Sequence, residues 1–406
     1  MFRNNTYQDA GYPDSMRSSG KGGGELPEVI ETMWKEEGAK QDLNGVLYKL
    51  DKIMAKLHGW SKKKFGNVMH ELEKNRKKLE QLLSMNGDRE EIRRLSDHID
   101  ELLYREEMLW LQRSRIAWLK EGDRNTKFFH QKAVWRSRKN KVQKLKDTDG
   151  SWKTVPTDME RMATSYFKEL FTKDPNLNPN PVLHVLEGRV NEDINNSLTA
   201  MFTDEEISNA LFQIGPLKAP GPDGFPTRFY QKNWSLLKEE IVAAVKLFFH
   251  TGHMPEGVNE ATIVLIPKID NPSELKDFRP ISLCTVLYKI VAKCLVNRIR
   301  PHLSELISQN QSAFVSGRLI TDNDLIAFEC LHFIEHNSKE DESLCAYKLD
   351  LSKAYDRVDW GFLRRAMERL GFADRWIDRI MEYVTTVRYK VKFNGALLES
   401  LSPSPR

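Results

Sequence analysis

The longest regular pattern in the sequence is helical, and it runs over residues 44–119. Its apolar residues recur at steps of three and four or their multiples, at Val68, Leu72, Leu79 and Leu82 and then at Ile92, Leu95, Ile99, Leu102 and Leu109. Lys, Arg and Glu fill the other positions, and SMNGD (84–88) interrupts the pattern. We therefore predict an antiparallel helical hairpin over residues 43–120. Its charged faces favour contact with water over a specific binding surface.

Composition narrows the class of protein. The 406 residues suffice for two or three domains. The sequence contains no run of about eighteen apolar residues, so no membrane span is predicted. Residues 1–42 are expected to be mostly a disordered tail, since the start is polar and has no apolar core of a secretory signal. The four cysteines show no CxxC spacing, which favours free thiols in a reducing compartment, either nucleus or cytoplasm: Cys284, Cys294, Cys330 and Cys345.

The segment 118–147 combines aromatic and basic residues, within a predicted unit over 121–202. Trp118, Phe128, Phe129 and Trp135 are interspersed with five cations that we regard as candidate nucleic-acid contacts, Arg124, Lys127, Lys132, Arg136 and Arg138. Cations neutralise phosphates and aromatic rings stack on bases, as single-stranded RNA requires. The same spacing also fits a helix that buries its aromatic face, and both interpretations stay open. A β-hairpin with its turn at Asp149-Gly150 is predicted next.

Residues 203–260 are predicted to form two helices around a Gly- and Pro-rich loop at 215–234. Thr203 and Glu206 fit a capping box at the first helix. ATIVLIPK (261–268) indicates a buried strand, 271–280 a polar loop, 281–303 an amphipathic helix, and 319–338 another helix. In the last of these, His332 and His336 lack the spacing of a zinc motif, so an ordinary helix is expected.

The last part of the chain contains KLDLSKAYDRVDW (348–360). LCAYKLD (344–350) indicates a strand that ends in Asp350, and helices over 358–372 and 376–384 and a hairpin over 389–397 follow. Carboxylates at strand ends often bind metals, whereas Asp356 and Asp359 suit a helix N-terminus. From the residues alone, a metal ligand and a plain surface acid remain equal alternatives for Asp350. The predicted fold class is helix-rich α+β.

Several long motifs carry a specific resemblance. IVLIPKIDNPSELKDFRPISLCTVLYKIVAKCLVNRI (263–299), NQSAFVSGRLITDN (310–323) and KLDLSKAYDRVDW resemble the reverse transcriptase of non-LTR (LINE-type) retrotransposons, particularly the plant lineage. LKAPGPDGFP (217–226) and WLKEGDRNTKFFH (118–130) are similar to segments that precede the polymerase core. The resemblance implies the fingers and first part of the palm of a right-hand polymerase fold over 261–406, after the helical hairpin.

The resemblance also implies roles for single residues. Asp350 would be a catalytic aspartate that binds Mg²⁺, with the backbone carbonyl of Leu351 as a further ligand. Tyr355 would sense the sugar, and Lys268 and Arg279 would bind the triphosphate of the incoming dNTP. Arg318 would contact the template. The implied partners are an RNA template, a DNA primer and dNTPs.

The sequence departs from this family in its catalytic motifs. The Tyr/Phe-Ala-Asp-Asp hairpin that would supply the remaining catalytic aspartates is not found, and the chain contains no Asp-Asp pair. Phosphoryl transfer depends on the placement of two metal ions, and the aspartates that would help to hold them are not found. We therefore expect the palm to be incomplete, and we expect no polymerisation by this chain alone. The alternatives are a non-catalytic RNA- or DNA-binding remnant, or a scaffold that acts through the helical hairpin.

Overall fold

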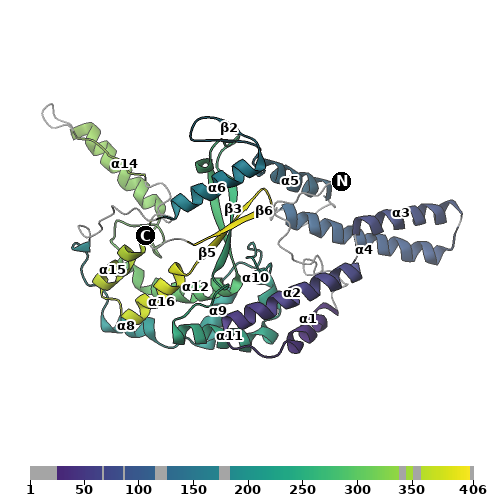
Figure 1. Cartoon of the computed structure of the whole chain (residues 1–406), viewed down its shortest axis with the longest axis horizontal. Coiled ribbons are helices and arrows are strands. Elements are labelled where there is room, and N and C mark those ends of the chain that lie inside the picture. The colour runs from purple at the N-terminus through teal and green to yellow at the C-terminus, as the bar shows by residue number, and fades with distance from the viewer. Residues whose placement is uncertain are drawn as a thin grey trace.

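A four-stranded sheet surrounded by helices organises the chain (Figure 1). The computed structural model describes residues 25–65, 68–85, 87–114, 126–172, 183–337, 344–350 and 358–402. The predicted helix-rich α+β class is confirmed. Among the described residues no helix is both long and apolar enough to cross a membrane.

The sheet is mixed, with the strand order β4-β3-β5-β6. β3 (Glu260–Pro267) pairs antiparallel with β4 (Phe278–Cys284) and parallel with β5 (Arg388–Phe393), which pairs antiparallel with β6 (Ala396–Leu401). A separate pair consists of β1 (Leu145–Lys146) and β2 (Trp152–Lys153). Both predicted hairpins are confirmed, with left-handed φ angles of 84° at Gly150 and 48° at Asn394.

The largest hydrophobic core lies among the helices below the sheet in Figure 1. They are α1 (Glu25–Glu36), α2 (Leu43–Phe65), α8 (Glu192–Thr199), α9 (Asp204–Phe212), α10 (Thr227–Lys232), α11 (Trp234–Thr251), α12 (Val286–Ile299), α15 (Trp360–Leu370) and α16 (Asp374–Thr385). The prediction of a tail over 1–42 is wrong for its second half, because α1 buries Ile30 and Trp34, each 3% exposed, in this core. Residues 1–24 lie outside the described part.

Two helices project away from this core. α3 (Val68–Ser84) and α4 (Arg89–Ser114) run alongside each other (Figure 1) and share a small core of Leu72, Ile99 and Leu102. α5 (Thr126–Lys139) contacts α4. α2 instead packs against α11 in the large core, so it is not part of this projecting pair.

α6 (Pro156–Leu170) covers one face of the sheet. Met159, Ala163 and Phe167 of this helix pack on alternate strand residues, which include Ile263, Leu265, Val391 and Phe393. Because strand side chains alternate between faces, the residues between them point to the opposite face. The register places Ile266 beside Arg279, and Val264 between Ile281 and Lys392. We call this opposite side the Arg279 face.

Two predicted elements differ in the structure. The helix expected over 281–303 begins only at Val286, after the Thr285 hydroxyl caps it by accepting from the Tyr288 N–H. Residues 278–284 instead pair with β3, because a buried strand needs neighbours for its backbone groups. The predicted strand at 344–350 is wrong: these residues are exposed and form no regular structure. No described strand pairs with them, and an unpaired extended segment has nothing to stabilise it.

The connection after α12 ends in an isolated helix. It contains η3 (Arg300–His302) and α13 (Leu303–Leu306), and leads to α14 (Ile320–Asn337), which projects from the body in Figure 1. The predicted helix is confirmed here, and no group of three metal-binding side chains occurs among the described residues.

Arg298, at the end of α12, joins three helices. Its guanidinium donates to both carboxylate oxygens of Glu206 on α9, at 2.8 and 3.0 Å. It also donates to the carbonyl of Leu198 in the last turn of α8 and to those of Ala200 and Met201 after it. It also lies 3.3 Å from the centre of the Phe202 ring. Glu206 completes the predicted capping box with Thr203. Burial alone would raise the pKa of Glu206, but the hydrogen bonds from Arg298 and Thr203 lower it.

We predict that Arg298→Lys lowers the free energy of unfolding by about 3 kcal/mol, because one ammonium cannot replace a planar donor that serves four partners. Urea unfolding followed by circular dichroism measures this change. Arg300→Lys is the matched control, since Arg300 is exposed two residues further along the chain. Equal midpoints for the two variants would contradict the role given to Arg298.

Candidate functional site

Lys268 and Arg279 lie together at the end of the β3–β4 pair. Arg279 is directly opposite Ile266, and the Lys268 N–H donates to the Asp277 carbonyl at 2.8 Å. Alternation along the strands puts both side chains on the Arg279 face, and both are exposed. The two cations that were predicted to bind a triphosphate are therefore brought together at one end of the sheet.

The loop between these cations is held by its own hydrogen bonds. The carboxylate of Asp277 accepts from the N–H groups of Ser273 and Glu274, each at 3.0 Å. The Glu274 N–H, with the further bonds from Ser273, lowers the pKa of Asp277 despite its partial burial. Leu275 anchors the loop in the core beside α6, within the 3₁₀ turn η2 (Leu275–Asp277). Arg279 thus projects from a fixed hairpin, and the Lys268 ammonium donates to the Lys276 carbonyl of the loop at 2.8 Å.

The basic end of α5 contacts this loop. Lys139 forms an ion pair with Asp270 at 2.7 Å, and this hydrogen bond lowers the pKa of Asp270. The Lys146 N–H donates to the Ser273 carbonyl at 2.8 Å. The cations of α5 therefore end beside the loop that carries Lys268.

The structure describes part of the predicted basic aromatic segment. Arg136 and Arg138 are exposed, and Trp135 is 55% exposed, which disagrees at Trp135 with the alternative of a buried aromatic face. The side chains of Lys127 and Lys132, and all of Arg124, lie outside the described part.

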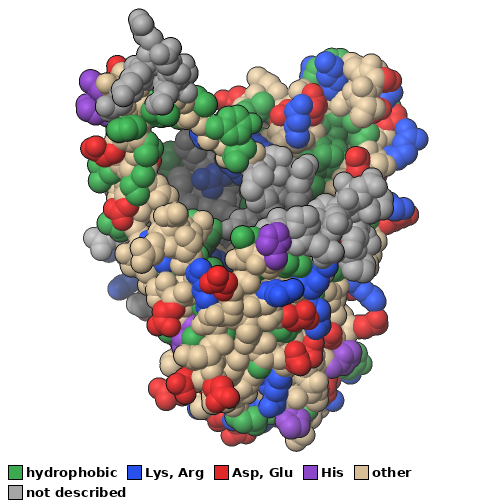
Figure 2. All heavy atoms as spheres, turned by 90° about the vertical axis from the view of Figure 1, so that its left-hand side faces the viewer, with side chains coloured by type: hydrophobic (Ala, Val, Ile, Leu, Met, Phe, Trp, Pro, Cys, Tyr) green, Lys and Arg blue, Asp and Glu red, His purple; other side chains and the backbone are tan. Residues whose placement is uncertain are grey.

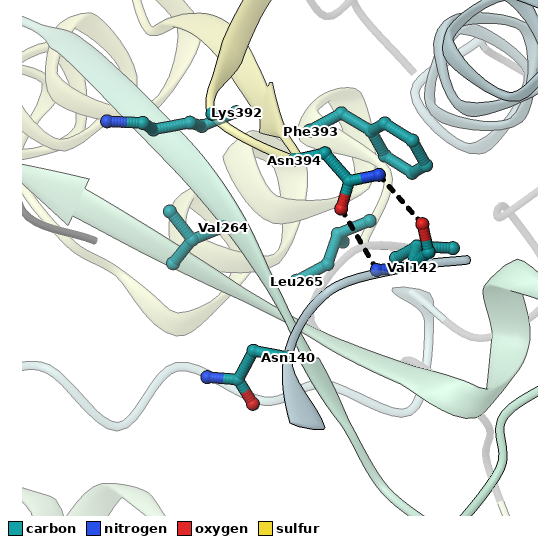
Figure 3. A pocket seen from close by; sticks show the side chains of 8 residues that line it. Asn140, Val142, Val264, Leu265, Lys392, Phe393 and Asn394 are labelled. Carbon is teal, nitrogen blue, oxygen red and sulfur yellow. Dashed lines mark hydrogen bonds between the residues drawn. The ribbon is translucent and has the colours of Figure 1, made fainter. Parts of the chain in front are cut away.

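Asn394 fixes the β5–β6 turn to the segment after α5. Its Oδ1 accepts from the Val142 N–H at 2.9 Å, and its Nδ2 donates to the Val142 carbonyl at 2.8 Å (Figure 3). A small hollow lies beside these bonds, with Asn140, Val264 and Lys392 on its wall. Sequence reasoning missed these residues, since an Asn-Gly turn predicts the hairpin but not what its side chain contacts.

The Arg318 side chain is hydrogen-bonded to carbonyl groups of its own loop. Its guanidinium donates to the carbonyls of Ser304, Ile307, Ser308 and Gln311 and so holds the segment before α14. A template phosphate would have to share these donors. The predicted template contact stays a prediction, and a structural role is evident.

Asp350 is exposed at the end of the described segment 344–350. Leu351, Tyr355 and Asp356 lie outside the described part. Asp359 is confirmed as a helix acid, because its carboxylate caps α15 by accepting from the Phe362 N–H. The carboxylate of Asp350 suits Mg²⁺ chemically, but no described cluster of acids accompanies it, so the described residues alone do not form a metal site.

The Gly- and Pro-rich loop packs against the junction of β4 and α12. A Cβ on Gly221 would lie 2.4 Å from the Cys284 carbonyl carbon, so only glycine permits this approach. Asp223 nearby is buried, and its carboxylate accepts from the Tyr230 hydroxyl at 3.3 Å. Burial raises the pKa of Asp223 to about 7, with a smaller rise from Asp51, while Lys289 opposes it.

Asp223 predicts a pH-dependent stability. Because its pKa of about 7 lies above the usual 3.8, folding takes up a proton, and this group's stabilising contribution falls as the pH rises from 4 through 7. The difference is on the order of 4 kcal/mol. Asp223→Asn is always neutral, so its free energy of unfolding, relative to the unmodified chain, should rise over this range. Urea titrations at pH 5, 6, 7 and 8 measure it, and a constant difference would refute it.

Part of this chain matches a known protein family. The family model described as reverse transcriptase (RNA-dependent DNA polymerase) matches residues 266–400. This range includes Lys268, Arg279, Arg318 and Asp350.

Three relatives indicate the kind of element in which such a segment occurs. A protein named transposon TX1 uncharacterized 149 kDa protein, of Xenopus laevis, is 30% identical over 71% of this chain and 22% of its own length. The RNA-directed DNA polymerase from mobile element jockey of Drosophila melanogaster is 24% identical over 53% of the chain and 23% of its length. The Pol polyprotein of the type-1 retrotransposable element R2 of Nasonia vitripennis is 26% identical over 47% and 17%. The chain thus spans about a fifth of these relatives.

Proposed function

We propose that this chain, whose residues 266–400 belong to the reverse transcriptase family of non-LTR retrotransposons, supplies the nucleotide- and template-binding part of an RNA-directed DNA polymerase. In this proposal the sheet is the fingers, and 344–350 with the helices α14 to α16 begins the palm. The α3–α4 pair is the helical hairpin that precedes them. The similarity to animal elements leaves the plant lineage a prediction.

The observation that carries the proposal is the meeting of Lys268 and Arg279 on one face of a fixed hairpin. A triphosphate carries several negative charges, and a guanidinium can donate two parallel hydrogen bonds to its oxygens while an ammonium binds as a point charge. Both groups are exposed, so a nucleotide reaches them without displacing the core. A hairpin fixed before binding lowers the entropy lost when the nucleotide binds.

The catalytic side of the proposal rests on Asp350. Family members use divalent metal ions, and we propose Mg²⁺, with Asp350 and the carbonyl of Leu351 among its ligands. When bound, two such ions would divide the chemistry: one would activate the primer 3′ hydroxyl and the other would hold the leaving pyrophosphate. Tyr355, in the same segment, is proposed to sense the sugar of the dNTP.

The exposed surface of α14 supports the proposal that the palm is incomplete. Several large apolar residues of this helix are exposed between its acidic and histidine residues, among them Leu325, Phe328 and Phe333, and Phe328 is 70% exposed. Figure 2 shows hydrophobic side chains along this projecting element at the upper left. A group of large exposed apolar side chains commonly marks a surface that packs against another part of a protein. We infer that α14 and the exposed segment 344–350 pack against the rest of the palm in the assembled polymerase.

Nucleotide binding tests the proposal directly. Arg279→Ala should weaken binding of a dNTP about tenfold, because it removes charge-assisted hydrogen bonds to phosphate. Titration calorimetry with Mg²⁺-dNTP measures the affinity. Arg388→Ala is the matched control, since Arg388 lies on the same sheet but is paired with Glu256 at 2.7 Å. The proposal fails if dNTP does not bind, or if both variants lose affinity equally.

The second candidate function is nucleic-acid binding without catalysis, which the exposed Arg136 and Arg138 favour. Primer extension on an RNA template separates the two. Because the sequence contains no Asp-Asp pair to supply the remaining metal ligands, we expect no incorporation of dNTP by this chain alone. Incorporation that Asp350→Ala abolishes would contradict this expectation.

A further inference from the structure

The hollow beside Asn394 lies where β5 turns away from β3. Val264 and Lys392 are the last paired residues of these strands, and Asn140 and Val142 lie beyond them. In Figure 3 the amide of Asn140 and the ammonium of Lys392 extend to the same side, away from the Asn394–Val142 bonds. Both polar groups are therefore directed outward from a wall that the Asn394 bonds fix.

The cations of β5 differ in how far they are neutralised. Arg388 pairs with Glu256 at 2.7 Å, and Lys390 pairs with Glu260 at 2.9 Å. Lys392 continues the same row, but no described acid pairs with it. Its positive charge remains available to a phosphate at the end of β5, while the charges further back are compensated.

This uncompensated cation is near the other candidate contacts. Two strand spacings and two residues separate Lys392 from Arg279 on the same face, about 12 Å between their Cα atoms. On the other side, Asn140 directly follows α5, whose Lys139 is bound to Asp270 of the β3–β4 loop. The hollow thus connects the exposed cations of α5 with the sheet face that carries Arg279.

We propose that Lys392 and Asn140 bind the backbone of the RNA template as it passes from α5 onto the Arg279 face, and that Asn394 is a positioning residue for this contact. The proposal rests on the function proposed above. Lys392 neutralises a backbone phosphate, and the Asn140 amide, which both donates and accepts, hydrogen-bonds a 2′-hydroxyl. A contact to the RNA strand gives Lys392 a role at a distance from Lys268 and Arg279, which are proposed to bind the nucleotide.

Asn394 acts through the backbone of Val142. Its side-chain amide accepts from the Val142 N–H at 2.9 Å and donates to the Val142 carbonyl at 2.8 Å, as the backbone of a neighbouring strand would. These two bonds hold the segment after α5 against the β5–β6 turn. Asn394 has a φ of 48°, which glycine adopts freely. Asn394→Gly therefore removes the amide bonds while keeping the backbone of the turn.

The test measures binding of a single-stranded RNA oligonucleotide by fluorescence anisotropy at several salt concentrations. Lys392→Ala should weaken binding several-fold and reduce the slope of log affinity against log salt by about 0.7, the loss of one phosphate contact to a single strand. Lys390→Ala, the matched control, should leave the slope unchanged because Lys390 is paired with Glu260. Asn394→Gly should weaken binding of an RNA long enough to span α5 and the sheet, with little effect on a very short one.

Each result decides the proposal. It is overturned if RNA does not bind, if Lys392→Ala keeps the full salt slope, or if Asn394→Gly weakens short and long RNA equally. Equal affinity for single-stranded DNA of the same sequence would also overturn it, because the 2′-hydroxyl would then not be recognised. Calorimetry with Mg²⁺-dNTP distinguishes this proposal from the proposed function. Lys392→Ala should leave the dNTP affinity unchanged. The dNTP affinity of Arg279→Ala tests the proposed function and does not test the RNA contact of Lys392.

Discussion

The pairing of β3 on both of its edges is the constraint on which the rest of the structure depends. This strand has a continuous apolar run, and its backbone groups need partners on either side once it is buried. β4 supplies one partner from the adjacent sequence, and β5 supplies the other from more than a hundred residues further along. Through these two pairings β3 sets Arg279 and Lys392 on one face and leaves the other face for α6.

The electrostatics of this sheet follow from which cations have acids beside them. Arg388 and Lys390 are neutralised by Glu256 and Glu260 at one end of the strands. At the other end the described carboxylates of Asp270 and Asp277 are already engaged, one by Lys139 and one by the loop's own N–H groups. The loop that carries them is therefore stabilised. The positive charges of Lys268, Arg279 and Lys392 are not neutralised by a described acid, although the Lys268 ammonium donates to the Lys276 carbonyl. This distribution favours a phosphate-containing ligand at that end.

Local signals in the sequence predicted much of the fold, and long-range packing accounts for what they missed. The capping box of Thr203 and Glu206, the acid cap at Asp359 and the turn at Asn394-Gly395 all depend on neighbouring residues, so their patterns were sufficient. The segment 281–284 has apolar spacing that also fits a helix, and only its pairing with β3 makes it a strand. For the same reason the bonds between Asn394 and Val142, which are 252 residues apart, have no local signature.

The candidate site was predictable as single residues but not as an arrangement. Lys268 and Arg279 came from a motif, whereas their common face depends on the register of β3 with β4. At the far end of β4, any side chain at Gly221 would collide with the backbone of Cys284 and Thr285. The Gly- and Pro-rich loop therefore packs closely against the far end of the strand that carries Arg279. The strand that carries one of the proposed phosphate-binding cations thus ends at a backbone approach that only glycine permits.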